Sequence, residues 1–314
     1  MQLVLYVVAM KVLTSALLLL GCLSLSAQEA WVSLSKVGGF SAWKGKVALF
    51  KVQEEVSQLP LEFRGPGANS FAVSNAVKEE NGLLLLEIEF KPTTERGYFS
   101  AELVVGSGDG AQVVQLRGVA TAALEGKNEP PLQELLDALG ANLDAGGKDL
   151  SLDSKATKIG DSVKASQFEP VGDGAVRLTP LARYSPPGDA PFGLAIPNGK
   201  EFTLQAVGSL AATTPARPDA HQTLRPPLAT GAPNVTVVDA PKRFGLFLEA
   251  HKYTSLTFPG KSVGAPIKHT ARIYPVEALG GKALQNAYIV GFEEASNGDY
   301  QDAVFLIEGV KAVK

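Results

Sequence analysis

Short apolar runs separated by turn-forming residues cover the first third of the chain. Leu84–Phe90 begins as a continuous apolar stretch and ends in alternating apolar and polar positions, which is typical of a strand inside a β-sandwich. Similar runs recur along residues 28–123, bounded by Gly, Pro, Asn or charged positions. Their spacing predicts an immunoglobulin-like β-sandwich over residues 28–123. The expected strands are Gly45–Val52, Leu61–Arg64, Ser70–Val77, Gly82–Phe90, Gly97–Val105 and Ala111–Val119.

A single convincing helix is expected after a polar linker over residues 124–131. Pro131 suits the first helical position, and Gly140 suits the position just after the helix. Because a helix of about eight residues does not persist alone in water, we expect it to pack on the second domain. A helix that binds a partner protein is the alternative. Its apolar face is formed by leucines at positions i, i+3, i+4 and i+7, namely Leu132, Leu135, Leu136 and Leu139.

Strand patterns return after the helix and continue to the C-terminus. Two proline-rich segments, Tyr184–Pro191 and Thr214–Pro233, are expected to be loops because proline cannot donate to a strand ladder. The many turns implied by 32 Gly and 20 Pro favour an all-β protein. Residues 132–314 are therefore predicted to form a larger, jelly-roll-like β-sandwich that carries the short helix. The expected strands are Lys148–Leu152, Ser162–Phe168, Ala175–Leu178, Lys200–Ala206, Ala287–Phe292 and Ala303–Ile307.

The N-terminus has the pattern of a targeting segment. Lys11 precedes the apolar stretch Val12–Leu25, which is followed by the small residues Ser26-Ala27. This order predicts a signal peptide over residues 1–27, and hence a secreted, periplasmic or cell-surface protein with no transmembrane segment after its removal. A membrane anchor is one alternative. A lipoprotein is another, because Leu19-Leu-Gly-Cys22 resembles the bacterial lipobox, whose cysteine is acylated.

Charge and cysteine content exclude two classes of function. The net charge is −3 and the basic residues form no block, whereas binding of nucleic acid requires a basic surface. The single cysteine, Cys22, excludes an internal disulfide framework and a cysteine-based zinc site. The expected partner is therefore an extracellular protein or a glycan, and not a nucleic acid.

An acidic loop lies between the last two expected strands. Crowded carboxylates repel one another unless water or a cation offsets the repulsion, and calcium is bound by six to eight oxygen ligands in irregular geometry. Gly298 stands where the loop is expected to need a positive φ angle. The loop predicts a calcium site, and a solvated acidic hairpin without metal is the alternative. The candidate ligands are Glu293, Glu294, Asn297, Asp299 and Asp302.

The same loop resembles a known signature. Phe292-Glu-Glu followed by Asp299-Tyr-Gln-Asp-Ala-Val-Phe is similar to the pattern "FED…(G)D-x-D-[FY]-N-D-[LV]-V-F". That pattern closes a bacterial secreted β-domain of unknown function, found in exported proteins of the planctomycete type. The resemblance covers about residues 168–314 and implies an exported β-domain with a calcium-binding loop. This chain departs from it at Gln301, where the family often has Asn, and at Glu294, where it often has Asp.

The N-terminal domain resembles a second family. Phe90-Lys-Pro92, Gly97-Tyr-Phe-Ser-Ala-Glu-Leu103 and Val114-Gln-Leu-Arg-Gly118 are similar to the frame of the ASPM/SPD-2/Hydin-type immunoglobulin-like domains. The resemblance implies a spacer or interaction module without catalytic residues.

These patterns favour a non-enzymatic binding or structural protein outside the cytoplasm. A carbohydrate-binding module is one alternative, since aromatic side chains such as Tyr184 and Tyr253 are the residue type that stacks on sugars. A hydrolase is a second alternative, in which His221 or His269 would act with a carboxylate. We expect no catalytic site, and calcium is the one cofactor predicted.

Overall fold

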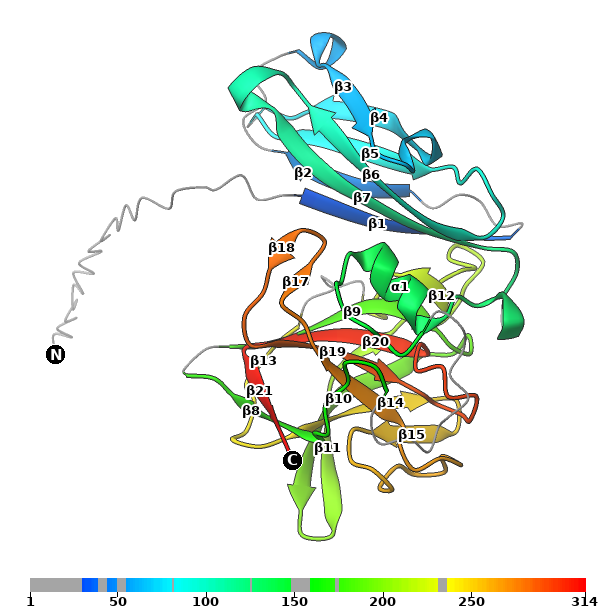
Figure 1. Ribbon diagram of the computed structural model, residues 1–314, viewed down its shortest axis with the longest axis vertical. Helices are drawn as coiled ribbons and strands as arrows, with labels where there is room; N and C mark the ends of the chain where they lie inside the picture. Colours follow the sequence, from blue (N-terminus) through cyan, green and yellow to red (C-terminus); the bar gives the residue numbers. More distant parts are fainter. Residues whose placement is uncertain are drawn as a thin grey trace, which may run out of the picture.

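The computed structural model describes residues 30–38, 44–49, 55–80, 82–124, 126–147, 159–172, 175–230 and 236–314. Two β-sandwiches follow one another along the chain, and the helix α1 (Leu132–Leu139) lies where they meet (Figure 1). The prediction of an all-β sandwich protein with a short helix is confirmed. The predicted signal peptide, Cys22 and the expected strand Lys148–Leu152 fall outside the described residues.

The N-terminal sandwich consists of a four-stranded sheet, in the order β1-β7-β6-β3, and a three-stranded sheet, β2-β5-β4. β1 runs parallel to β7, and the other neighbouring strands of this sandwich are antiparallel. Two facing sheets of three and four strands form an immunoglobulin-like architecture. The strands are β1 (Ala30–Val37), β2 (Lys44–Leu49), β3 (Leu61–Arg64), β4 (Phe71–Lys78), β5 (Leu84–Phe90), β6 (Gly97–Val105) and β7 (Gln112–Thr121). Short 3-10 helices occupy Val56–Gln58, Ala68–Ser70, Gly108–Gly110 and Gly126–Asn128.

Phe90 organises the core of this sandwich. Its ring is fully buried and lies 5.2 Å from the ring of Phe71 and 5.5 Å from that of Phe99. Gly118 of β7 faces it, and a Cβ atom at that position would lie 2.5 Å from the Phe90 ring. The packing of the phenylalanine therefore explains a glycine in the middle of a strand.

The C-terminal sandwich also consists of two facing sheets. The larger contains the path β12-β9-β20-β19-β16, with β13 also paired to β9, and the smaller has the order β11-β10-β14-β15. Its strands are β8 (Gln167–Pro170), β9 (Val176–Tyr184), β10 (Ala190–Asn198), β11 (Glu201–Leu210), β12 (Gln222–Leu224), β13 (Thr236–Val238), β14 (Gly245–Ala250), β15 (Tyr253–Leu256), β16 (Ala271–Pro275), β17 (Ala278–Leu279), β18 (Lys282–Ala283), β19 (Ala287–Phe292), β20 (Ala303–Glu308) and β21 (Val310–Val313).

The larger sheet is buried on both faces, which explains the continuous apolar runs of β19 and β20. Phe292 and Phe305 belong to the core between the two sheets. Ile289 and Val304 belong to a second core on the opposite face, which they share with the leucines of α1. A strand that is buried on both faces has no solvent-facing positions, so apolar residues follow one another along it instead of alternating with polar ones.

The helix occupies the face predicted from its leucine spacing. Leu135, Leu136 and Leu139 are completely buried, so the prediction that α1 packs on the second domain is confirmed. The helix ends at Gly140, whose φ angle of 71° lies in the left-handed region. Pro131 precedes the helix as its N-cap, one position earlier than predicted. Val119 of β7 joins the same core, so this core extends into the N-terminal sandwich.

Proline did not end the strands as expected. β9 continues through Pro180 to Tyr184, because a bulge in its pairing with β20 lies beside Pro180. β10 contains Pro191, which the sequence analysis placed in a loop. The expected loop Tyr184–Pro191 is therefore reduced to the short connection between these two strands.

In the described part of the chain, no helix is long and apolar enough to cross a membrane.

Candidate metal centre

The loop that joins β19 to β20 is folded around the side chain of Glu293. Its Oε1 accepts a hydrogen bond from the backbone N–H of Ala295 at 2.8 Å. Its Oε2 accepts two more, from the N–H groups of Gly298 at 2.8 Å and Asp299 at 3.1 Å. Gly298 has a φ angle of +80°, which confirms the predicted positive φ. A buried carboxylate thus holds the loop in a tight turn.

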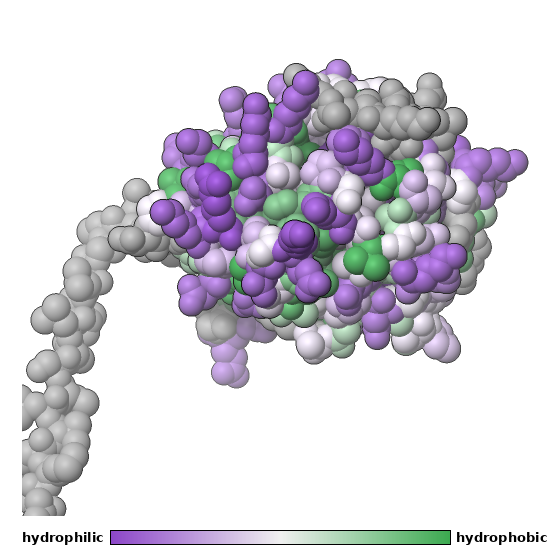
Figure 2. Space-filling view, turned by 90° about the horizontal axis from the view of Figure 1, so that it is seen from below, coloured by the Kyte–Doolittle hydropathy of each residue, from purple (hydrophilic) through white to green (hydrophobic). Residues whose placement is uncertain are grey.

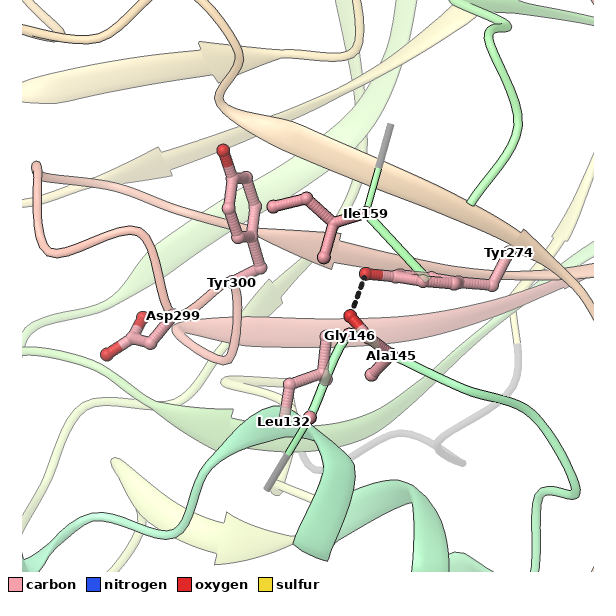
Figure 3. Close-up of a pocket in the computed structure, with 8 residues that line it drawn as sticks. Leu132, Ala145, Gly146, Ile159, Tyr274, Asp299 and Tyr300 are labelled. Carbon is pink, nitrogen blue, oxygen red and sulfur yellow. Dashed lines mark hydrogen bonds between the residues drawn. The ribbon is translucent and has the colours of Figure 1, made fainter. Parts of the chain in front are cut away.

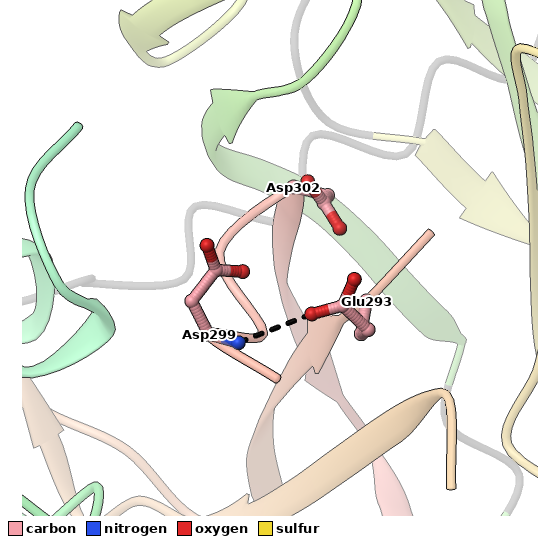
Figure 4. A group of neighbouring side chains, drawn as sticks. All are labelled: Glu293, Asp299 and Asp302. Carbon is pink, nitrogen blue, oxygen red and sulfur yellow. Dashed lines mark hydrogen bonds between the residues drawn. The ribbon is translucent and has the colours of Figure 1, made fainter. Parts of the chain in front are cut away.

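Three of the five predicted ligands converge. Glu293, Asp299 and Asp302 each place a carboxylate oxygen within 4.8 Å of the others, and all three side chains are buried (Figure 4). We call these three residues the carboxylate cluster. Asp302 Oδ2 accepts a hydrogen bond from the Glu294 N–H. Asp299 Oδ1 is buried and has no hydrogen-bond partner, so an acceptor within the cluster is left unsatisfied.

The other two predicted ligands lie beside the cluster. Asn297 donates from Nδ2 to Asp299 Oδ2 at 2.5 Å, so its amide supports a cluster carboxylate. Glu294 is buried as well, and its charge acts on the guanidinium of Arg183. Four of the five predicted ligands are therefore buried and Asn297 is exposed, but only the cluster carboxylates meet at one point.

Burial and, after it, electrostatic repulsion raise the pKa values of two cluster carboxyls. Burial raises the pKa of Asp299 to about 8, with further contributions from the charges of Glu293 and Glu129. Burial, followed by the charges of Glu293 and Asp299, raises the pKa of Asp302 well above its usual value. Without a cation these two groups resist ionisation at neutral pH.

Tyr300 attaches the loop to β16 and to His269, which precedes that strand. It adopts a φ angle of +57°, which is uncommon for a residue with a side chain. Its hydroxyl donates to the carbonyl of His269 at 2.8 Å and accepts from Arg272 Nη2 at 3.0 Å. The Arg272 guanidinium also lies over its ring, 4.5 Å from the centroid. These contacts hold the backbone in a conformation that it would otherwise avoid.

A small cavity of about 10 Å³ adjoins the loop (Figure 3). Asp299 and Tyr300 line it from the loop, and Leu132 lines it from α1. Tyr274 also lines it, donating its hydroxyl to the Ala145 carbonyl at 3.2 Å. This volume is about that needed by one water molecule.

Gly291 provides the first test of the loop. A Cβ atom at this position would lie 2.4 Å from the carbonyl oxygen of Tyr300, so Gly291→Ala must push the loop away from β19. We expect the free energy of unfolding, measured in urea, to fall by about 1–3 kcal/mol. Gly110→Ala is the control, because a Cβ atom there meets nothing within 4 Å. Equal losses in both variants would contradict the close approach.

The sequence analysis missed two residues around the loop. Glu129 lies in the predicted linker, yet it is buried and accepts hydrogen bonds from Gln222 at 2.6 Å and Gln301 at 3.2 Å. Arg183, on β9, is buried and donates to Ser185 and three backbone carbonyls. Arg183 directly precedes the expected loop Tyr184–Pro191, and the carbonyls of such a loop can supply the many acceptors that a buried arginine needs.

The two histidines of the hydrolase alternative lie outside the carboxylate cluster. His221 is hydrogen-bonded through Nδ1 to the hydroxyl of Thr213, and burial together with the charge of Arg183 lowers its pKa. The pKa of His269 is lowered by burial and by the positive charges of Arg272 and Lys268. Both histidines are therefore disfavoured in their charged form.

In comparisons with known proteins, no protein-family model matches the chain, and no curated protein matches it.

Proposed function

We propose that this chain is an exported, non-enzymatic binding or structural protein whose C-terminal sandwich is stabilised by calcium. The observation that supports the cation is the carboxylate cluster, in which three buried acids meet and Asp299 Oδ1 has no partner. Export is supported by the sequence pattern of Lys11 and Val12–Leu25.

The donor set suits calcium. It consists of oxygen atoms alone, and a carboxylate oxygen that accepts one N–H bond retains a lone pair for a metal. Glu293, Asp299 and Asp302 supply part of the six to eight oxygens that calcium takes, and carbonyl oxygens or water supply the others. Magnesium fits less well, because it requires nearly octahedral geometry and loses water reluctantly. Burial raises the pKa values of Asp299 and Asp302, and a bound cation would offset the mutual repulsion that raises them further.

The carbohydrate-binding alternative is less favoured, because several tyrosines that could stack on a sugar are buried or packed on other rings. Tyr184, Tyr274 and Tyr300 are at most 2% exposed and cannot stack on a sugar. Tyr288 packs on Phe168, with ring centroids 5.8 Å apart. On the face shown in Figure 2, hydrophilic side chains are interspersed with small, separate hydrophobic areas.

Calcium should raise the stability of the full chain. If it binds only the folded state, the free energy of unfolding increases by about 2.7 kcal/mol at a hundredfold excess over Kd. We expect the melting temperature to rise between EDTA and millimolar calcium, with a smaller rise in magnesium. Differential scanning calorimetry measures both.

Asp299→Asn together with Asp302→Asn should abolish this response, while Asp109→Asn, in an exposed turn of the N-terminal sandwich, should retain it. Equal melting temperatures of the wild type in EDTA and in calcium would refute the site.

A further inference from the structure

The segment that runs from the end of β14 to the end of β16 is basic, although the chain as a whole is slightly acidic. Residues 250–276 include no Asp or Glu, and the net charge of the chain is −3. Lys252, Lys261 and Lys268 of this segment are exposed. In the described part of the chain no carboxylate, including that of the neighbouring Glu249, forms an ion pair with any of these three lysines. Their positive charges therefore face solvent without a partner.

The loop Lys261–Lys268 carries apolar residues between two of these lysines, and we call it the lysine-flanked loop. The Gly260 N–H donates to the Lys268 carbonyl at 2.7 Å, so the two ends of the loop lie side by side. Between the lysines the sequence is Ser-Val-Gly-Ala-Pro-Ile. Val263 is 66% exposed, the largest value among the large apolar side chains that the structure describes. The loop therefore combines an exposed apolar side chain with two free positive charges.

The third lysine lies beside this loop. Val263 and Thr254 exchange backbone hydrogen bonds of 2.9 and 3.0 Å, so the loop follows β15. A Cβ atom at Gly264 would lie 3.2 Å from the backbone carbonyl of Lys252, which belongs to the turn between β14 and β15. In Figure 1, β15 lies at the end of the C-terminal sandwich that is remote from the N-terminal sandwich. The three lysines and Val263 thus belong to one outer surface.

This combination fits an anionic membrane surface. Each lysine close to a membrane that contains anionic lipids strengthens binding by about 1 kcal/mol, which is about fivefold. An apolar side chain that enters the boundary between headgroups and acyl chains adds to the attraction. A soluble polyanion would use the charges but offers no apolar phase, so it leaves the exposure of Val263 unexplained.

We propose that the lysine-flanked loop docks this protein on an anionic phospholipid membrane, with Lys252, Lys261 and Lys268 at the headgroups and Val263 inserted among them. The proposal goes beyond the proposed function, because it names a lipid surface as a partner and does not involve the carboxylate cluster. Docking of this kind would hold an exported protein at a membrane without a spanning segment.

Sedimentation of the full chain with lipid vesicles tests the charges. In EDTA and at low salt, the wild type should bind vesicles of equal parts phosphatidylcholine and phosphatidylglycerol, but not vesicles of phosphatidylcholine alone, and added salt should weaken the binding. Lys261→Gln together with Lys268→Gln should weaken it about 10- to 30-fold. Lys282→Gln together with Lys311→Gln is the matched control. It changes the net charge equally at exposed positions of β18 and β21, which lie far from β15 in Figure 1, and should retain the binding.

A second pair of variants tests the apolar contact. Val263→Gln should weaken vesicle binding about 3- to 10-fold, because a polar side chain gains less from entering the membrane. Val237→Gln is the control, since Val237 is 61% exposed on β13 and lies outside the proposed surface. Inorganic polyphosphate serves as the soluble polyanion, and Val263→Gln should leave binding to it unchanged.

Three results would overturn the proposal. The first is no binding of the wild type to the anionic vesicles, and the second is equal weakening by the two pairs of lysine substitutions. The third is binding of vesicles and polyphosphate that depends on Lys261 and Lys268 but not on Val263, which would identify a soluble polyanion as the partner. Because every assay contains EDTA, none of these results bears on the proposed calcium site. Selective weakening by the loop variants supports docking on the membrane.

Discussion

Replacing Arg183 with methionine is expected to lower the free energy of unfolding by about 3–5 kcal/mol, because each buried acceptor left without its donor costs about 1–3 kcal/mol. Arg183 is 1% exposed. Its Nε donates to the Ser185 hydroxyl at 2.8 Å, and its terminal nitrogens donate to the carbonyls of Ala211 at 2.8 Å, Pro186 at 2.7 Å and Gly188. Methionine has a similar length but no donor, so these acceptors lose their partner inside the protein.

The Arg183→Met substitution should also destabilise the acidic loop between β19 and β20. The charges of Glu294 and Asp302 act on Arg183, whose pKa burial lowers to about 10, so it is still charged at neutral pH. Removing it takes away a positive charge that interacts with Glu294 of this loop. Urea unfolding measures the loss.

Arg243→Met is the control, because Arg243 pairs with Glu169 at 2.6 Å but its side chain is 55% exposed. An exposed pair of this kind contributes at most about 1 kcal/mol. Arg183→Lys should fall between the two, since lysine keeps the charge but cannot donate in four directions. Similar losses for Arg183→Met and Arg243→Met would show that the buried arginine does not organise this region.

The second large effect is a pH dependence of stability that calcium removes. In EDTA, the free energy of unfolding should fall as the pH rises from about 4 to about 8, by about 1.4 kcal/mol per pH unit for Asp299 alone. The sign follows from the raised pKa of Asp299, about 8 in the folded protein. Between the unfolded and folded pKa values the folded state binds more protons, so removing protons favours unfolding. Asp302 adds a contribution of the same sign.

Calcium should remove this decline, because it binds the ionised carboxylates and replaces their protons. Binding should therefore tighten with rising pH and release protons, which titrations in buffers of different ionisation enthalpy detect. Urea unfolding between pH 5 and 8 gives the stability profile in EDTA and in calcium. Asp299→Asn with Asp302→Asn should flatten the EDTA profile. A stability that rises with pH in EDTA in the wild type would mean that these carboxyls are not held in their neutral form.

The sequence alone determined the elements whose signal is local. The leucine spacing of Leu132–Leu139 fixed the helix and its buried face, because helical periodicity depends on neighbouring residues only. The runs Leu61–Arg64, Gly97–Val105 and Ala287–Phe292 fixed three strands to the residue. The acidic loop and the positive φ of Gly298 were likewise evident, since turn chemistry is carried by the turn residues themselves.

The tertiary structure decided where polar residues are buried. β1 is missing from the expected strands because Ser35 is buried at the contact between sandwiches, where its hydroxyl is hydrogen-bonded to Thr223. β9 continued through Pro180 because a bulge in its pairing with β20, a strand distant in sequence, accommodated the proline. Glu129 was assigned to a linker, yet it meets Gln301, 172 positions away. Burial of a charge depends on partners that the fold brings together across the chain, and no local pattern encodes them.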